Sequence, residues 1–349
     1  MVNQIFGMFS KDLGIDLGTA NTLVYVKEKG IVINEPSVVA INTRNDNIVA
    51  VGEDARIMLG KTPPHITAIR PLVDGIISDF EATERMLRYF IDKVHQDKFS
   101  FLPRPQVVLG IPLDVTEVEK KAVEDAAISA GARKVYLVEE PLAAAIGARL
   151  PINDASGSMI VDIGGGTTEI AVISLAGAVT WRSLRTAGDE LINDIVQYVR
   201  DNFNVLIGER TAESIKTGIG SVYPHDEPVQ IAIRGRDLMS GLPKEVMMSS
   251  EHARDAMSRT VHQIIENIKA TIELTPPELV ADIYERGIAL SGGGALLKGL
   301  PQLINSETGI KAFVVDDPLT CVARGTGMII ENLPQYQQLI VPSTNDTHA

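Results

Sequence analysis

The stretch Val161-Asp-Ile-Gly-Gly-Gly-Thr-Thr-Glu169, followed by Ile170-Ala-Val-Ile173, decides the fold. An apolar run ends at Asp162, three glycines follow, and Thr167 and Thr168 open a second apolar run. This pattern predicts a β-hairpin with bare backbone at its tip. Because glycine lets main-chain N–H groups approach an anion closely, the tip is a candidate phosphate site, and a hydrated Mg²⁺ would offset the aspartate charge. A hairpin that needs glycine only for its turn is the alternative for this stretch alone.

The same pattern occurs a second time near the start of the chain. A shift of 146 residues sets Ile15-Asp16-Leu17-Gly18 on Val161-Asp162-Ile163-Gly164 without a gap, and sets Thr22 on Thr168. Two related hairpins indicate two related domains. We therefore expect an α/β fold in which both tips close around one polyphosphate in the cleft between the domains.

Length and composition fit this division and exclude several classes of function. The 349 residues are 45% hydrophobic, which suffices for two ordinary cores. The net charge of −13, with no basic stripe, argues against a nucleic-acid partner. The only cysteine, Cys321, excludes a disulfide framework and is expected to be a small buried hydrophobe.

Two apolar segments are candidate membrane contacts. Ile5, Phe6 and Phe9 share one face of a short N-terminal helix, and Phe101 and Leu102 lie in a connection between periodic elements. A frayed or partner-docking terminus is the alternative for the first segment, and a loop packed onto the core is the alternative for the second. No run of eighteen or more apolar residues occurs, so no membrane-spanning helix is expected.

Strands and helices alternate along the rest of the chain, as in mixed sheets covered by helices. Residues 220–250 are polar and punctuated by proline and glycine, and they are the best candidate for a variable insertion. Strands are expected at 12–15, 23–26, 31–41, 48–51, 106–111, 134–138, 161–173, 179–184 and 229–233, and helices at 79–96, 116–131, 188–199, 209–217, 251–274 and 319–333. Asp79 is expected to cap the first of these helices, and Thr116 with Glu119 to form a capping box at the start of the second.

One phosphate-binding signature is rejected. Leu59-Gly60-Lys61-Thr62 has the sequence of the end of a P-loop, but Ala55 stands where that motif needs glycine, and no buried strand precedes it.

Three further positions carry chemistry. Glu140 follows a strand and precedes a helix that Pro141 favours, and ligands of α/β sheets bind at such strand ends. The stretch 288–298 predicts a strand, a glycine turn and a helix, so a base or a phosphate could lie against its backbone, unless the glycines serve only a tight turn. Glu213 and Lys216 lie three residues apart on one helix, where a solvated salt bridge is the ordinary interpretation.

In order and spacing, the two hairpins, the Glu-Pro-Leu-Ala-Ala-Ala connection and the late glycine turn resemble the ATPase superfamily of actin, heat-shock chaperones and sugar kinases. Within it, the chain is similar over nearly its whole length to the MreB family of bacterial cell-shape actins. The stretches that carry this resemblance are Asp16-Leu-Gly-Thr-Ala-Asn-Thr-Leu23, Asn34-Glu-Pro-Ser-Val-Val-Ala40, Asp162-Ile-Gly-Gly-Gly-Thr-Thr-Glu169 and Asp317-Pro-Leu-Thr-Cys-Val-Ala-Arg324. The resemblance implies an actin-like ATPase fold.

The resemblance also implies a role for each site residue. It places Asp16 and Asp162 around a Mg²⁺ ion and its waters, Glu140 beside the attacking water, and Thr167 beside the γ-phosphate. The remaining residues implied to hold ATP are Gly18, Thr19, Ala20, Asn21, Gly164, Gly165, Gly166, Glu213, Lys216, Gly292, Gly293, Gly294 and Ala295.

The implied activity is slow ATP hydrolysis coupled to head-to-tail polymerisation, with protofilaments paired antiparallel. The protein would be cytoplasmic and bound to the inner face of the cell membrane, where it would organise peptidoglycan synthesis with RodZ and MreC. The expected parts are a membrane-binding segment at 1–10, a first domain at 11–145 plus 318–340 with a small subdomain near 32–72, a second domain at 146–317 with a small subdomain near 182–248, and a polar tail at 341–349.

Two other functions fit the superfamily less well. A small-molecule kinase would need a catalytic base for its acceptor, and none stands out. The ATPase half of a chaperone would be followed by a peptide-binding domain, and the sequence ends before one.

Overall fold

A computed structural model describes residues 10–96, 104–224 and 229–343. The chain forms two compact units, and each is described by itself. The first contains the residues up to Asp154, Ile173–Ala178, and the segment from Leu319 onward. The second contains Ala155–Val172 and Val179–Pro318.

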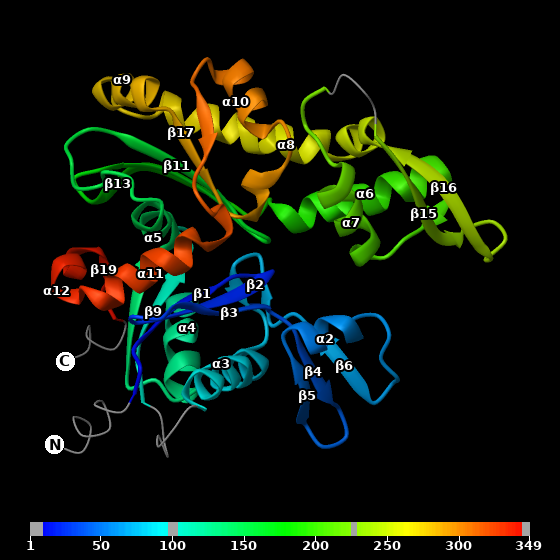
Figure 1. The fold of residues 1–349 in the computed structure, drawn as a ribbon, viewed down its shortest axis with the longest axis horizontal. Coiled ribbons are helices and arrows are strands. Elements are labelled where there is room, and N and C mark those ends of the chain that lie inside the picture. The colour runs from blue at the N-terminus through cyan, green and yellow to red at the C-terminus, as the bar shows by residue number, and fades with distance from the viewer. Residues whose placement is uncertain (1–9, 97–103, 225–228, 344–349) are drawn as a thin grey trace. The chain divides into compact units, whose positions relative to one another are not determined.

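The first unit is built on a six-stranded sheet in the order β19-β10-β9-β1-β2-β3 (Figure 1). The sheet is mixed, because β9 pairs in parallel with β1 and β10 whereas β2 is antiparallel to both β1 and β3. The predicted first hairpin is confirmed as β1–β2, in which Asp16 pairs with Leu23. The strands are β1 (Leu13–Leu17), β2 (Asn21–Val26), β3 (Gly30–Pro36), β9 (Gln106–Ile111), β10 (Lys134–Glu139) and β19 (Ile340–Val341).

Helices α3 (Phe80–His95), α4 (Glu117–Ser129), α5 (Glu140–Gly147) and α11 (Cys321–Glu331) belong to this unit. Both predicted helix starts are confirmed. Asp79 accepts a hydrogen bond from the N–H of Ala82 at 2.9 Å. Thr116 and Glu119 form a complete capping box, which satisfies N–H groups that the first turn of a helix leaves unpaired.

The predicted strand 31–41 is two strands in different sheets. The chain leaves β3 at Pro36, and after Ser37 it enters a three-stranded sheet formed by β4 (Val39–Asn42), β5 (Asn47–Val51) and β6 (Ile66–Ile69). Helix α2 (Glu53–Met58) packs beside them and ends before Gly60, so the rejected P-loop signature follows a helix. A short hairpin, β7 (Leu72–Val73) with β8 (Ile76–Ile77), follows.

The second unit repeats the strand order of the first. Its sheet runs β13-β12-β11-β17-β18, which corresponds to β3-β2-β1-β9-β10, and β17 is parallel to both β11 and β18. The duplication predicted from the two hairpins is therefore confirmed at the level of the whole sheet. The strands are β11 (Ser158–Ile163), β12 (Thr168–Ser174), β13 (Gly177–Leu184), β17 (Ile288–Ser291) and β18 (Ala312–Val314).

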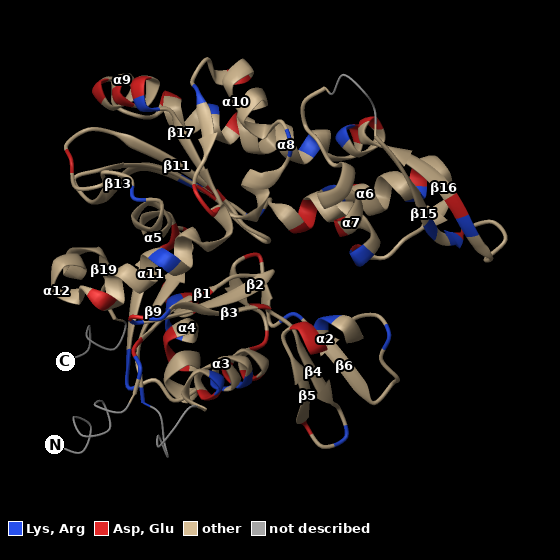
Figure 2. Ribbon diagram, viewed as in Figure 1, with Lys and Arg blue, Asp and Glu red and all other residues tan. Residues whose placement is uncertain are grey.

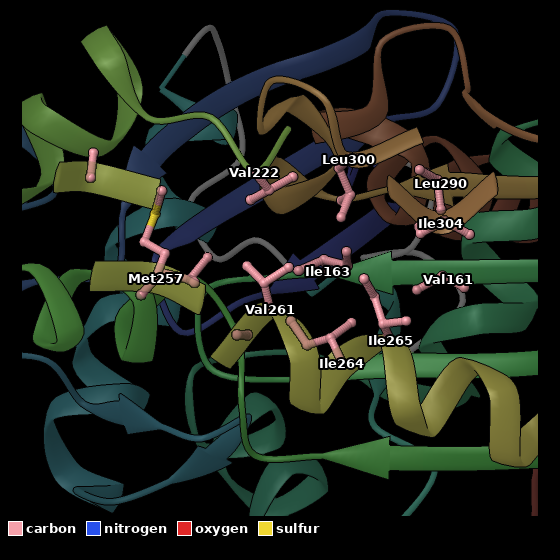
Figure 3. Packing of buried hydrophobic residues seen from close by; sticks show 14 of the residues in the cluster. Val161, Ile163, Val222, Met257, Val261, Ile264, Ile265, Leu290, Leu300 and Ile304 are labelled. Carbon is pink, nitrogen blue, oxygen red and sulfur yellow. The ribbon is translucent and has the colours of Figure 1, made fainter. Parts of the chain in front are cut away.

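Helices α6 (Gly188–Phe203) and α8 (Ser250–Glu273) contribute to the core of this unit. Figure 3 shows Val161, Ile163 and Leu290 of the sheet packed with Val261 and Ile264 of α8. Helix α7 (Glu209–Ile219) packs on α6, and α9 (Pro277–Arg286) and α10 (Leu300–Thr308) complete the unit.

Two features of this unit differ from the predictions. The insertion holds a hairpin of β15 (Gln230–Asp237) and β16 (Pro243–Ser249), joined at one edge by β14 (Val205–Leu206), where one strand was expected. Charged residues of both signs lie on this hairpin, and they interrupt its apolar pattern (Figure 2). The helix expected at 251–274 is confirmed as α8, which ends at Glu273, but the helix that follows it, α9, was not expected; its first residue is Pro277, at a position that tolerates proline.

The C-terminal segment also differs from its predicted form. The helix expected at 319–333 is α11, followed by the separate short helix α12 (Leu333–Tyr336). Val341, assigned to the polar tail, lies in β19 opposite Leu137. Ser343 then donates a hydrogen bond to the buried carboxylate of Glu124 at 2.6 Å, so the start of the tail belongs to the first unit.

Helices α5 and α11 pack at backbone distance because each carries a glycine at the contact. A Cβ atom on Gly147 would lie 1.9 Å from the carbonyl oxygen of Cys321, and one on Gly325 would lie 1.8 Å from that of Ala143. Since backbone atoms cannot move aside as a flexible side chain can, neither position has room for a side chain.

Gly325→Ala should therefore lower the free energy of unfolding by about 1–3 kcal/mol. Gly218→Ala is the matched control, because Gly218 lies in α7 with nothing within 4 Å of the added methyl group. The control should be neutral or more stable by up to about 1 kcal/mol, since alanine favours helix. Urea unfolding measures both, and equal stabilities would contradict the packing argument.

Candidate functional site

The tip between β1 and β2, residues 18–21, is the first candidate site. A Cβ atom on Gly18 would lie 2.7 Å from the carbonyl oxygen of Asn21, so the tip closes only with glycine there. Asp16 precedes the tip on β1 and is partly buried. Thr19 is buried and Ala20 is exposed.

Ser37 holds this tip from the neighbouring chain segment. Its N–H donates to the carbonyl of Ala20 at 3.0 Å, and its hydroxyl donates to the carbonyl of Gly18 at 2.6 Å. Gly75 adds a third contact, from its N–H to the Thr19 hydroxyl at 3.0 Å. Sequence reasoning missed Ser37 and Gly75. Ser37 could have been found, because it lies in one of the stretches that carry the family resemblance.

Glu140 is the first residue of α5, directly after β10, as predicted. Its side chain is 9% exposed and passes over Gly110 of β9, where a Cβ atom would lie 3.2 Å from its Cγ. Gly75 and Gly110 line one hollow of the first unit together with Leu17. Gly75, which binds the first tip, and Gly110, which lies under Glu140, therefore border the same hollow. Burial raises the pKa of the adjacent Glu139, an effect that Lys120 opposes.

The second tip, residues 164–167, is closed by a hydrogen bond from the N–H of Gly164 to the carbonyl of Thr167 at 2.9 Å. The buried Thr168 hydroxyl donates to the carbonyl of Thr186 at 2.7 Å, which ties β12 to the segment before α6. Thr167 is itself almost fully buried.

Asp162 lies at the end of β11, opposite Ser291 of β17. Its carboxylate is 7% exposed and accepts a hydrogen bond from the Ser291 hydroxyl at 2.7 Å. Burial raises the pKa of Asp162 to about 6, and the bond from Ser291 opposes that change. A nearby cation stabilises a desolvated carboxylate, so the Asp162 carboxylate is suited to bind a hydrated divalent ion.

The glycine turn after β17 lies against the end of β11. Gly292 has a φ of 79°, and a Cβ atom there would lie 2.3 Å from the carbonyl oxygen of Ile163. A Cβ atom on Gly294 would lie 2.2 Å from the Ile163 side chain. These glycines are therefore required by packing as well as being candidates for ligand contact, and Ala295 is buried.

The prediction of an α-helix at this turn was wrong. Residues Gly293–Leu296 form a single 3₁₀ turn, and α10 begins only at Leu300. The close approach of the turn to β11 and the bond from the N–H of Gly292 to the carbonyl of Pro318 at 2.9 Å hold the segment outside α-helical geometry.

Lys216 of α7 binds Gly188, which in turn binds the second tip. Its ammonium donates to the carbonyl of Gly188 at 3.1 Å, and the N–H of Gly188 donates to the carbonyl of Gly164 at 3.2 Å. Glu213 is exposed on the same helix. Sequence analysis did not identify Gly188 or Ser291 as site residues, because only the tertiary fold brings them to the tip.

The second unit thus gathers a buried carboxylate, a glycine tip, an ammonium group and a glycine turn. This donor set fits a phosphate with a divalent cation, because backbone N–H groups and a lysine bind anions while a carboxylate binds the ion. Within residues 10–96, 104–224 and 229–343, no cluster of three or more His, Cys, Asp or Glu side chains could hold a metal ion by itself. Asp16 belongs to the first unit and Asp162 to the second.

The candidate membrane residues Ile5, Phe6, Phe9, Phe101 and Leu102 lie outside the described residues. Among the helices that the structure describes, none has the length and apolar character needed to cross a bilayer.

The raised pKa of Asp162 predicts how stability depends on pH when Mg²⁺ and nucleotide are absent. Between about pH 4 and pH 6 the folded state binds a proton that the unfolded chain does not, so this group adds stability that is lost as pH rises through 6. From pH 7 to pH 5 the wild type should gain about 1 kcal/mol relative to Asp162→Asn. Urea unfolding in EDTA measures this, and parallel pH curves would contradict it.

Comparison with known proteins agrees with this geometry. The sequence model of the MreB/Mbl protein family matches residues 10–338 of this chain. The cell shape-determining protein MreB of Escherichia coli (strain K12) is 52% identical over 342 residues, which are 96% of this chain and 98% of that protein. The cell shape-determining protein Mbl of Bacillus subtilis (strain 168) is 48% identical over 326 residues, which are 93% and 97% of the two chains.

Solved structures show the same fold. MreB5 of Spiroplasma citri bound to AMPPNP superposes with a TM-score of 0.88 at 37% identity, over 94% of this chain and 98% of that one. The MamK double helical filament has a TM-score of 0.79 at 23% identity, over 93% of this chain and 100% of that one, and shows likeness of fold. The predicted actin-like fold is confirmed, and the chain belongs to the MreB/Mbl family.

Proposed function

We propose that this protein is an ATP-dependent, membrane-associated cytoskeletal protein that polymerises into actin-like filaments and organises peptidoglycan synthesis to set rod cell shape. Family membership and the cell shape-determining relatives support the biological role. The likeness to MreB5 bound to AMPPNP and to ADP supports the nucleotide. The observation that carries the proposal is the second tip, which follows the buried Asp162 and accepts a hydrogen bond from Gly188, the residue that Lys216 binds.

The glycine tips would bind the phosphates of ATP through main-chain N–H groups, residues 18–21 in the first unit and residues 164–167 in the second. Asp16 and Asp162 would hold Mg²⁺ through its waters. When bound, the ion would neutralise charge on the phosphates. Asp162 suits this role because its carboxylate has lost most of its own hydration.

Glu140 would orient the attacking water and accept its proton, and Thr167 would donate to the γ-phosphate. Both side chains are buried; Glu140 is the first residue of α5, and Thr167 directly precedes β12. Hydrolysis would be slow in a single subunit, because positioning of the water depends on domain closure and neighbouring subunits.

The adenosine moiety would lie against α7 and the glycine turn of the second unit. Glu213 and Lys216 would contact the ribose and base, and the backbone from Gly292 through Gly293 and Gly294 to Ala295 would line the base. Because the Ala295 side chain is buried, its contribution would come from the backbone.

Polymerisation would join different surfaces of successive subunits, and such heterologous contacts extend into filaments. Protofilaments would pair antiparallel on the inner face of the cell membrane, together with RodZ and MreC. Residues 1–10 and the loop with Phe101 and Leu102 would contact lipid, and the polymer would add many weak contacts by avidity. We also propose the domain boundaries expected from the sequence, with a first domain at 11–145 plus 318–340 and a second domain at 146–317.

Glu140→Ala should retain ATP but release phosphate about 100-fold more slowly, because the water loses its base. Glu124→Ala is a matched control, since Glu124 is a buried glutamate of the same unit that binds Ser343. Phosphate release is measured with no small-molecule acceptor present, at several protein concentrations. Normal turnover in Glu140→Ala would remove this residue from the mechanism.

Purified protein with ATP and Mg²⁺ should form filaments visible by negative-stain electron microscopy. A lack of filaments both with and without liposomes would contradict the cytoskeletal proposal.

Changing Phe6 and Phe9 to glutamate should release filaments from liposomes, because charged side chains do not enter the bilayer interface. Phe80→Glu is the control, since Phe80 is an exposed phenylalanine on α3 of the first unit. Liposome co-sedimentation measures binding. Unchanged binding in the double variant would move the lipid contact to Phe101 and Leu102.

A further inference from the structure

Helix α6 begins without a side-chain cap, and the second glycine tip replaces it. The residue before the helix, Ala187, has no side chain that could accept a hydrogen bond. The N–H of Gly188 donates instead to the carbonyl of Gly164 at 3.2 Å, and the N–H of Asp189 donates to the carbonyl of Gly165 at 2.8 Å. The tip thus satisfies N–H groups that the first turn of a helix leaves unpaired.

These bonds also decide which way the N–H groups of the tip point. In a planar trans peptide the C=O and N–H vectors are opposed. The carbonyl of Gly164 shares its peptide plane with the N–H of Gly165, and the carbonyl of Gly165 shares its plane with the N–H of Gly166. Because both carbonyls face α6, both N–H groups face away from it, which is the orientation that a phosphate ligand needs.

Lys216 binds the peptide unit between Gly188 and Asp189, at the start of α6. Its ammonium donates to the carbonyl of Gly188, and that carbonyl belongs to the peptide unit whose N–H, on Asp189, donates to Gly165. One peptide plane therefore links the lysine to the tip. A charge-assisted bond at its oxygen polarises the plane and strengthens the bond from its N–H.

Position 188 has little room beyond its hydrogen atoms. A Cβ atom there would lie 3.4 Å from the Lys216 ammonium and 3.0 Å from the carbonyl oxygen of Gly164. A cation beside the first turn of α6 also opposes the dipole of that helix, so α6 gains no electrostatic stability from it. The benefit of this contact lies at the tip.

We propose that Lys216 is a positioning residue that fixes the glycine tip of the second unit through the Gly188–Asp189 peptide. Helix α7, which carries Lys216, and the phosphate-binding N–H groups then form one rigid assembly before nucleotide arrives. This role rests on the proposed function for its use in ATP binding, and it adds an action of Lys216 that needs no contact with the nucleotide.

Amide hydrogen exchange of the nucleotide-free full chain tests this, together with ATP affinity in the presence of Mg²⁺. In Lys216→Met the Asp189 amide should exchange at least about threefold faster, and the dissociation constant for ATP should rise about tenfold. Lys216→Arg keeps the charge and should restore both in part. Lys298→Met is the matched control, because Lys298 also donates to a backbone carbonyl at 3.1 Å, that of Gly218, in the same unit. It should leave the Asp189 amide unchanged.

Weaker ATP binding with unchanged Asp189 exchange would show that Lys216 only touches nucleotide, and would overturn the positioning role. Equal acceleration in Lys298→Met would also overturn it, because general loosening would then explain the effect. Failure of the wild type to bind ATP would contradict the proposed function instead. The exchange rates of the nucleotide-free protein would still decide the role of Lys216.

Discussion

Both glycine tips are held through their carbonyl oxygens, and the candidate site depends on this constraint. In the first unit, Ser37 binds the carbonyls of Gly18 and Ala20. In the second unit, the first turn of α6 binds those of Gly164 and Gly165. A flexible glycine turn gains a defined shape only when such bonds offset its conformational entropy. The two units reach the same result with different donors, although their sheets share one strand order.

Burial gives the carboxylates of the site their chemical character. Asp162 lies near the end of β11 beside Ser291, and Glu140 begins α5 over a glycine of β9. Asp162 lies within a buried strand and Glu140 directly follows one, so both carboxylates lose hydration. A carboxylate in such a place is costly without a cation or a proton, which explains the raised pKa of Asp162. The architecture that forms the two cores therefore also prepares these groups for a charged ligand.

Two of the expected elements failed for the same physical cause. The strand expected at 31–41 breaks at Ser37, whose hydrogen bonds to the first tip redirect the chain. The helix expected after Gly292 stays a single 3₁₀ turn, because its glycines lie against Ile163. In both places a contact with a distant segment outweighs local propensity, and a local pattern cannot report that contact. The strand β16 was missed for a different reason, because it begins with Pro243 and the charged pair Lys244 and Glu245, which leaves only a short apolar run.

The sequence by itself determined the duplicated hairpins, the mixed sheets with covering helices and the capped starts of α3 and α4, because these follow from hydrophobic period and short-range hydrogen bonds. It also indicated Asp16, Glu140 and Asp162 at strand ends. Only the tertiary structure decided what supports them. Ser37, Gly188 and Ser291 reach the tips from elements distant in sequence, and no periodicity links them. Lys216 changed most, from half of a helical salt bridge to a donor at the start of α6, because packing of α7 on α6 sets its partner.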